Sequence, residues 1–136
     1  MAIPTASEDA DAAEYYEKLF KDQLGCTGAR SLRIKTREDA NRTDFAELAA
    51  KARGIFFGGG DQVLVTKALL DTPVGNAIAD AFARGAVVGG TSAGTACQSA
   101  LRHFVSLDLV FYVGSQLPHR SAVHEIFCGE SQPYLG

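Results

Sequence analysis

The sequence predicts an α/β fold of three layers, with helices on both faces of a doubly wound, mostly parallel sheet. Short apolar runs alternate along the chain with amphipathic segments of helical period. Strands separated in this way by helices pair in parallel. Two of the runs, 54–57 and 86–89, contain no polar side chain. That pattern is typical of strands covered on both faces.

Length and composition indicate one globular domain. The chain has 136 residues, 46% of them hydrophobic and 21% charged, which is enough to bury a core. A net charge of −3 argues against a nucleic-acid partner. No apolar run approaches the roughly 20 residues of a membrane span. The three cysteines lack CxxC spacing and the N-terminus lacks a basic leader, so we expect no metal site and a cytoplasmic location.

A cap and an apolar stripe predict the first helix. Residues 1–6 contain the end of a short strand, and Ser7 then supplies a helix N-cap. The helix is expected to run to about Leu24 and to end at Gly25. Its inward face follows the helical period through Ala12, Tyr15, Tyr16, Leu19 and Phe20.

The alternation of apolar and polar residues and the position of polar stretches predict the next segments. Residues 31–36 alternate apolar and polar side chains, which predicts an edge strand. The polar stretch 37–42 is expected to be a loop. A second helix begins at Thr43 or Asp44 and runs to Arg53, with four apolar residues facing inward: Phe45, Leu48, Ala49 and Ala52.

Two glycine-rich turns follow the two strands that are apolar throughout. The strand 54–57 leads into the turn 58–62, a helix over 63–70 and a further helix over 74–84. The strand 86–89 leads into the turn 90–94. Because ligands bind at the carboxyl ends of parallel strands, we expect both turns to face one crevice.

The second turn, Gly-Thr-Ser-Ala-Gly, matches the G-x-S-x-G motif. Between a strand and a helix, this motif forms a nucleophile elbow, in which a strained turn exposes the serine hydroxyl. The N–H groups at the start of the helix then face a developing negative charge. Ser92 is therefore the candidate catalytic residue. The alternative is a plain strand-to-helix connection with Thr91 or Ser92 as the N-cap.

A serine nucleophile needs donors for the oxyanion. We expect these to be the N–H of Ala93 and an N–H of Gly59 or Gly60 from the other turn. Asp61 and Gln62, at the head of the next helix, are candidates for substrate binding. Their alternatives are a helix N-cap and an exposed first-turn residue. The glycine turn lacks the spacing of a P-loop or of G-x-G-x-x-G, so a dinucleotide-binding module is the weaker hypothesis.

The general base is not identified from the residues. His103 lies eleven residues after Ser92, which is about 15 Å along a helix. His119 and His124 are weak candidates, and ordinary solvated histidines are the alternative. Both lie in a segment, 103–136, that we expect to be a divergent, poorly ordered tail after the core 1–102, with a strand over 107–113.

Four segments in order resemble the cyanophycinases, which belong to a serine peptidase family that also contains aspartyl dipeptidase. The segments are 3–7, 36–41, 54–62 and 86–94, and the resemblance covers about residues 1–100. It implies a fold related to class I glutamine amidotransferases, usually in a homodimer, and hydrolysis of cyanophycin, an arginine-branched polyaspartate, to β-Asp-Arg dipeptides without a cofactor or metal. It also implies that Ser92 is the nucleophile, that Gly60 and Ala93 form the oxyanion region and that Gln62 contacts substrate.

The chain also departs from this family. Its members have one more strand before the first matching segment, and their catalytic histidine lies in an Asp-Gln-His-Phe-like stretch that we do not find in this sequence. Three interpretations follow. The chain is a cyanophycinase-like peptidase, an inactive truncated remnant that at most binds Asp-Arg peptides, or a related isoaspartyl or aspartyl dipeptidase.

Overall fold

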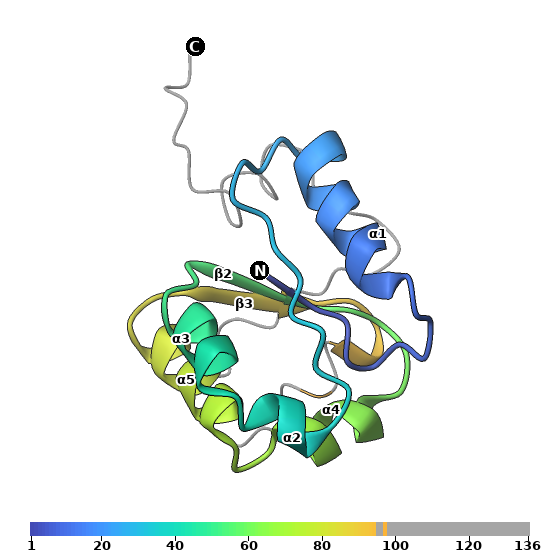
Figure 1. Ribbon diagram of the computed structural model, residues 1–136. Coiled ribbons are helices and arrows are strands. Elements are labelled where there is room, and N and C mark those ends of the chain that lie inside the picture. Colours follow the sequence, from blue (N-terminus) through green and yellow to red (C-terminus); the bar gives the residue numbers. More distant parts are fainter. Residues whose placement is uncertain (95–96, 98–136) are drawn as a thin grey trace.

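A parallel sheet lies between two layers of helices in the computed structural model, which describes residues 1–94 and Cys97 (Figure 1). Helix α1 (Ala12–Lys18), continued by the π-helical turn η1 (Leu19–Gln23), covers one face. Four helices cover the other face: α2 (Arg37–Ala40), α3 (Thr43–Ala50), α4 (Gln62–Leu69) and α5 (Pro73–Ala83). The predicted α/β class and the doubly wound parallel sheet are confirmed.

The three described strands are β1 (Ala2–Ile3), β2 (Gly54–Phe57) and β3 (Val87–Gly90), in that order across the sheet. All pairs are parallel. Phe57, the last residue of β2, lies opposite Ile3 of β1 and Gly90 of β3. Because the three strands end at the same level, the turns that follow β2 and β3 leave the sheet side by side.

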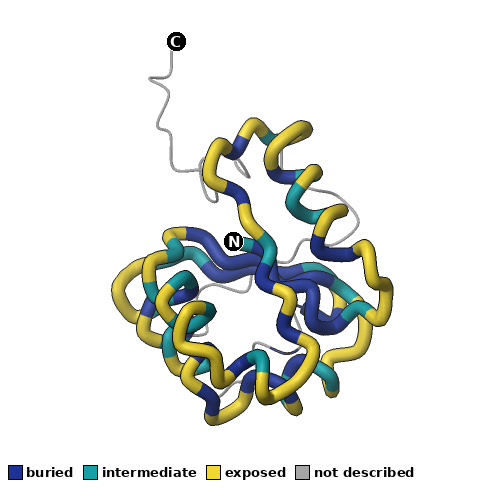
Figure 2. Tube along the Cα trace, in the orientation of Figure 1, coloured by how far each residue is buried: buried dark blue, intermediate teal, exposed yellow. Residues whose placement is uncertain are grey.

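The strands are buried on both faces, as Figure 2 shows. On the side of α2 to α5, strand residues such as Ile55 and Phe57 pack with Ile78 in one apolar cluster. On the side of α1, Ala2 and Phe56 pack with Phe20 in a second cluster. The absence of polar side chains from β2 is thus explained by contact with a helical layer on each side.

The first helix starts later than predicted. Helix α1 begins at Ala12, not after Ser7. The Ser7 hydroxyl accepts the Asp9 N–H at 3.1 Å, and Asp9 Oδ1 accepts the Asp11 N–H at 3.0 Å. These side chains satisfy local turns before the helix, which is the ordinary competition between Ser or Asp and helical hydrogen bonding. Tyr15, expected to face inward, is 60% exposed.

Residues 31–36 do not form the predicted edge strand, but their apolar side chains are buried, as the alternating pattern indicated. Only an isolated bridge joins Ser31 to Ala2. Leu32 and Ile34 are nevertheless buried while the residues between and after them are exposed. The ladder ends because β1 has only two residues and the next residue, Pro4, has no N–H to donate.

The expected loop over 37–42 contains the short helix α2. Thr36 Oγ1 accepts the Asp39 N–H at 3.3 Å, and Asp39 Oδ2 accepts the Thr36 N–H at 3.0 Å. This is a capping box. N–H donors from Lys35 and Thr36 lower the pKa of Asp39 because they stabilise its carboxylate.

The remaining helices match the prediction closely. Helix α3 begins at Thr43, as expected, and ends three residues before Arg53 at Ala50. Helices α4 and α5 lie within one residue of their predicted bounds, and Gly85 ends the second with a φ of +99°. Within the described residues, no helix is long and apolar enough to cross a membrane.

The N-cap of α5 gives a test of this packing. Thr72 is fully buried, and its hydroxyl accepts the Gly75 N–H at 3.1 Å and donates to the Leu69 carbonyl at 2.7 Å. We predict that Thr72→Ala lowers the free energy of unfolding by about 2 kcal/mol, because it removes a cap and leaves buried polar groups unpaired. Urea unfolding of the purified wild-type and variant chains measures this difference in free energy.

Thr66→Ala is the matched control. Within the described residues, the Thr66 hydroxyl bonds only to carbonyls of its own helix, from Gln62 and Val63, so its loss should change stability by less than about 0.5 kcal/mol. Equal losses in the two variants would contradict the assignment of Thr72 as a structural cap.

Candidate active site

The backbone at Ser92 is strained in the way that a nucleophile elbow requires. Ser92 has a φ of +52°, in the left-handed region that non-glycine residues seldom adopt, and its side chain is exposed. It directly follows Thr91, whose N–H donates to the Phe57 carbonyl at 3.1 Å, and the Gly94 N–H closes the turn on the Thr91 carbonyl at 2.9 Å. The chain enters a helix at Ala93.

Close contact between the two turns explains the glycine at position 94. A Cβ there would lie 2.2 Å from the Phe57 carbonyl oxygen and 2.7 Å from that of Gly58. Real side chains do not approach backbone this closely, so only glycine fits. The start of the helix after Ser92 therefore rests directly on the end of β2.

The glycine turn 58–60 lies against the serine from the other side. A Cβ on Gly59 would lie 3.7 Å from Ser92 Cβ and 3.4 Å from the Thr91 carbonyl oxygen, which are ordinary contact distances. Gly60 has a φ of +140°, and a Cβ on it would lie 2.0 Å from the Ala6 carbonyl oxygen. The crevice expected from the sequence is thus a contact between two turns, with Ser92 at its edge.

Most N–H groups around Ser92 already have acceptors. Those of Gly58 and Asp61 donate to the carbonyls of Ile3 and Ala6, at 3.1 and 2.8 Å. The Gly59 N–H donates to the Tyr16 hydroxyl at 3.2 Å. Within residues 1–94, the N–H groups of Gly60 and Ala93 donate no hydrogen bond. Ala93 and Gly60 are both among the expected oxyanion donors, whereas the N–H of Gly59, the alternative to Gly60, is bonded to Tyr16.

Asp61 and Gln62 lie at the start of α4, as expected, and both are exposed. Asp61 Oδ1 accepts the Val63 N–H at 2.8 Å, so Asp61 is the helix N-cap that the alternative interpretation described. This bond uses one carboxylate oxygen and leaves the other for a ligand. The Gln62 amide makes no hydrogen bond to the part of the chain that the structure describes.

Cys97 stands behind the elbow and is not a second nucleophile. Its thiol is fully buried and donates to the Gly94 carbonyl at 3.2 Å. Burial raises the pKa of the Cys97 thiol to about 12. The thiol therefore stays protonated at neutral pH, when only a thiolate would be reactive.

Two polar residues behind the glycine turn gave no functional signal in the sequence. Tyr16, predicted only as part of the inward face of α1, accepts the Gly59 N–H. Thr5, next to Ala6, is buried, and its hydroxyl has no hydrogen-bond partner within the described residues. Such orphaned hydroxyls are uncommon in folded proteins.

The candidate bases lie outside the described residues. His103, His119 and His124 fall there, as do the predicted strand 107–113 and the tail 103–136. In the described part of the chain, no three His, Cys, Asp or Glu side chains are grouped as metal ligands.

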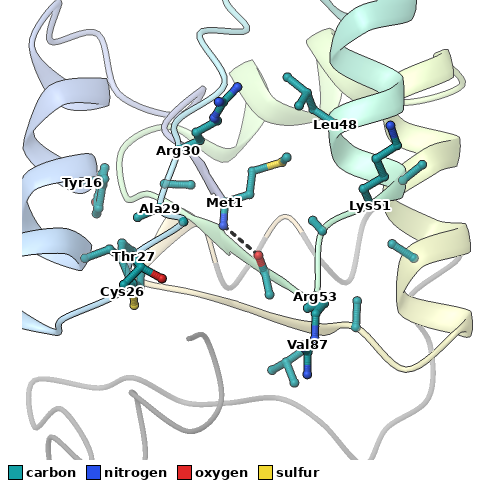
Figure 3. Close-up of a pocket in the computed structure, with 18 of the residues that line it drawn as sticks. Met1, Tyr16, Cys26, Thr27, Ala29, Arg30, Leu48, Lys51, Arg53 and Val87 are labelled. Atoms are coloured by element: carbon teal, nitrogen blue, oxygen red, sulfur yellow. Dashed lines mark hydrogen bonds between the residues drawn. The ribbon is translucent and has the colours of Figure 1, made fainter. Parts of the chain in front are cut away.

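A cavity of about 760 Å³ lies at the opposite end of the sheet (Figure 3). Met1, Gly54 and Val87, at the amino ends of the strands, line it, and the Met1 amino group donates to the Gly54 carbonyl at 2.9 Å. Ser92 and the glycine turn are not among its lining residues. Because ligands of parallel α/β sheets bind at the carboxyl ends of strands, the serine turn is the stronger candidate site despite this cavity.

Known proteins resemble the chain over the region just described. The model of peptidase family S51 matches residues 1–108. Cyanophycinase from Synechococcus elongatus is 33% identical over 96 residues, which cover 69% of this chain and 30% of that protein. Cyanophycinase from Geminocystis herdmanii is 34% identical over 96 residues, or 69% of this chain and 35% of that protein. The chain thus spans about a third of the length of these relatives.

A solved structure shares the fold. The crystal structure of a peptidase from an acI-B1 Actinobacterium has a TM-score of 0.61 and 34% sequence identity. The match covers 69% of this chain and 40% of that one.

The contact at Gly94 gives a test of the elbow geometry. We predict that Gly94→Ala lowers the free energy of unfolding by about 3 kcal/mol, because the new methyl group meets two backbone carbonyls that cannot move apart without disturbing β2. Gly28→Ala is the control, since nothing lies within 4 Å of a Cβ there. Urea unfolding compares the two. A Gly94→Ala chain as stable as Gly28→Ala would contradict the close approach of the turns.

Proposed function

The chain belongs to peptidase family S51, and we propose that it is a serine-type peptidase with Ser92 as its nucleophile. The observation that carries the proposal is the exposed serine in left-handed backbone, with a φ of +52°, at the carboxyl end of the parallel strand β3. Such strain is retained where the surrounding structure enforces it, and here Gly94 and the end of β2 do so.

In this proposal, Ser92 Oγ attacks the scissile carbonyl and forms a tetrahedral intermediate. The N–H groups of Gly60 and Ala93 donate to its oxyanion; both are without acceptors in the described residues. The intermediate collapses to an acyl-enzyme as the amine leaves with a proton, and water then releases the acid. For the base that takes the serine proton, the candidates are His119 and His124, because His103, the other histidine after Ser92, would lie about 15 Å away along a helix.

Cyanophycin is the proposed substrate, and β-Asp-Arg dipeptides are the proposed products. Two relatives bear the name cyanophycinase at 33% and 34% identity. The free carboxylate oxygen of Asp61 suits a substrate guanidinium, with which it would form a charge-assisted hydrogen bond. The unengaged amide of Gln62 is a second contact for the peptide. The proposal includes a cytoplasmic homodimer and a peptidase core over 1–102 followed by a separate tail.

Replacing Ser92 tests the proposal. We predict that the 136-residue chain releases β-Asp-Arg from insoluble cyanophycin, and that Ser92→Ala lowers the rate at least about a thousandfold, because the nucleophile is lost. Thr43→Ala removes a hydroxyl from an exposed residue of α3 and should leave the rate unchanged. Dipeptide release is measured by chromatography.

Other outcomes separate the alternatives. Equal turnover by Ser92→Ala would contradict the role of Ser92. A folded wild-type chain that releases nothing from cyanophycin and cleaves isoaspartyl or aspartyl dipeptides would be the related dipeptidase. A folded chain that cleaves neither substrate would be an inactive protein that at most binds Asp-Arg peptides, as calorimetry with the dipeptide would establish.

A further inference from the structure

We propose that Tyr16 is a positioning residue for the oxyanion site: its hydroxyl holds the turn 58–61 so that the Gly60 N–H stays unengaged beside Ser92. The inference rests on the proposed function of Ser92 and Gly60. The contact that carries it joins the Gly59 N–H to the Tyr16 hydroxyl at 3.2 Å, across 43 residues of sequence. It is the only side-chain acceptor for an N–H of this turn in the described part of the chain before Asp61 caps α4.

Packing fixes the tyrosine ring. Tyr16 lies on α1, and its ring centroid is 5.7 Å from that of Phe56, in β2 next to the end of the strand. The ring of Tyr15 packs edge to face with it, at 5.2 Å between centroids. Phe20, one turn further along, also packs on Phe56, at 5.4 Å. With its ring held by the sheet and by its neighbours, Tyr16 presents its hydroxyl at a fixed place.

The helix that bears Tyr16 is itself tied to the fold. The Ser31 hydroxyl donates to the Ala13 carbonyl at 2.7 Å, and the Ser31 N–H donates to Glu17 Oε2 at 3.3 Å. Ser31 in turn is bridged to β1 at Ala2. The position of the hydroxyl therefore depends on the edge of the sheet as well as on the aromatic contacts.

The same ring explains the first glycine of the turn. A Cβ on Gly58 would lie 2.7 Å from Tyr16 Cε2 and 3.0 Å from the hydroxyl oxygen. The ring edge thus covers the backbone at position 58, where a larger residue would displace it. A Cβ on each glycine would meet a different neighbour: Tyr16 at Gly58, Thr91 and Ser92 at Gly59, and Ala6 at Gly60.

These contacts hold the backbone on both sides of the Gly60 N–H. The N–H groups on either side of it, those of Gly59 and Asp61, are bonded to Tyr16 and to the Ala6 carbonyl. Three successive glycines otherwise have wide conformational freedom. Loss of the Tyr16 hydroxyl releases one of the two anchors, so the Gly60 peptide can rotate away from the oxyanion position.

Tyr16→Phe tests the inference, because it removes the hydroxyl and keeps the ring. The control is Tyr15→Phe, whose hydroxyl is exposed and makes no hydrogen bond in the described residues. Two readouts are made on the 136-residue chain: hydrogen exchange at the Gly59 amide by NMR, and the rate at which a fluorophosphonate probe labels Ser92. The phosphonyl oxygen of the probe requires the oxyanion donors, as a substrate carbonyl does.

We expect Tyr16→Phe to speed exchange at Gly59 and to slow labelling of Ser92, each by about tenfold. Tyr15→Phe should change neither, and both variants should stay folded by circular dichroism. Unchanged exchange at Gly59, or unchanged labelling in Tyr16→Phe, overturns the inference. If the folded wild-type chain does not label at Ser92, the proposed function fails; exchange at Gly59 then decides alone whether the hydroxyl holds the turn.

Discussion

The parallel register of β2 and β3 is the constraint on which the site depends. Phe57 lies opposite Gly90, so the two strands release their turns at one level of the sheet. The Phe57 carbonyl then accepts the Thr91 N–H and lies against Gly94. A shift of either strand by one residue would turn each of its side chains toward the opposite helical layer, where a different residue now packs, and would move the two turns out of line. The two-sided core therefore fixes the geometry around Ser92.

Glycine residues make the close approach of the two turns possible, and hydrogen bonds restrict the conformational freedom of the glycine turn. The turn after β2 is held through backbone bonds to Ile3 and Ala6 and through the hydroxyl of Tyr16. All three strands thus contribute to the candidate site. Strand β1 and the loop after it supply the carbonyl groups that hold the turn, β2 leads into the glycine turn, and β3 leads into the strained serine. Within the described residues, the N–H groups of Gly60 and Ala93 have no acceptors, as their proposed role as oxyanion donors requires.

The sequence predicted the elements that are buried on two faces and missed those that depend on tertiary detail. Strands β2 and β3 and the helices around them were predicted closely, because apolar runs and caps are local signals. The start of α1 was missed because Ser7 and Asp9 satisfy turns before the helix. The ladder at 31–36 ended at Pro4, whose effect on a neighbouring segment has no local pattern.

The candidate site was predictable in part for the same reason. The motif identified Ser92 and Ala93 as candidates, the other glycine turn added Gly59 or Gly60, and the helix-cap alternative for Asp61 followed from its place before a helix. The bond between Tyr16 and Gly59 was not, since it spans 43 residues and its aromatic side chain matched an ordinary core stripe. The buried strands were thus predictable from sequence, whereas the side chain that holds the glycine turn could be identified only from the structure.

The most direct measurement is peptide mapping by mass spectrometry after the folded chain is treated with a fluorophosphonate. We predict one phosphonyl adduct, on Ser92, that is absent after thermal unfolding, because the reactivity comes from the strained turn and the two N–H donors rather than from serine itself. A folded chain with no adduct on Ser92, or with an adduct that forms equally well after unfolding, would contradict it.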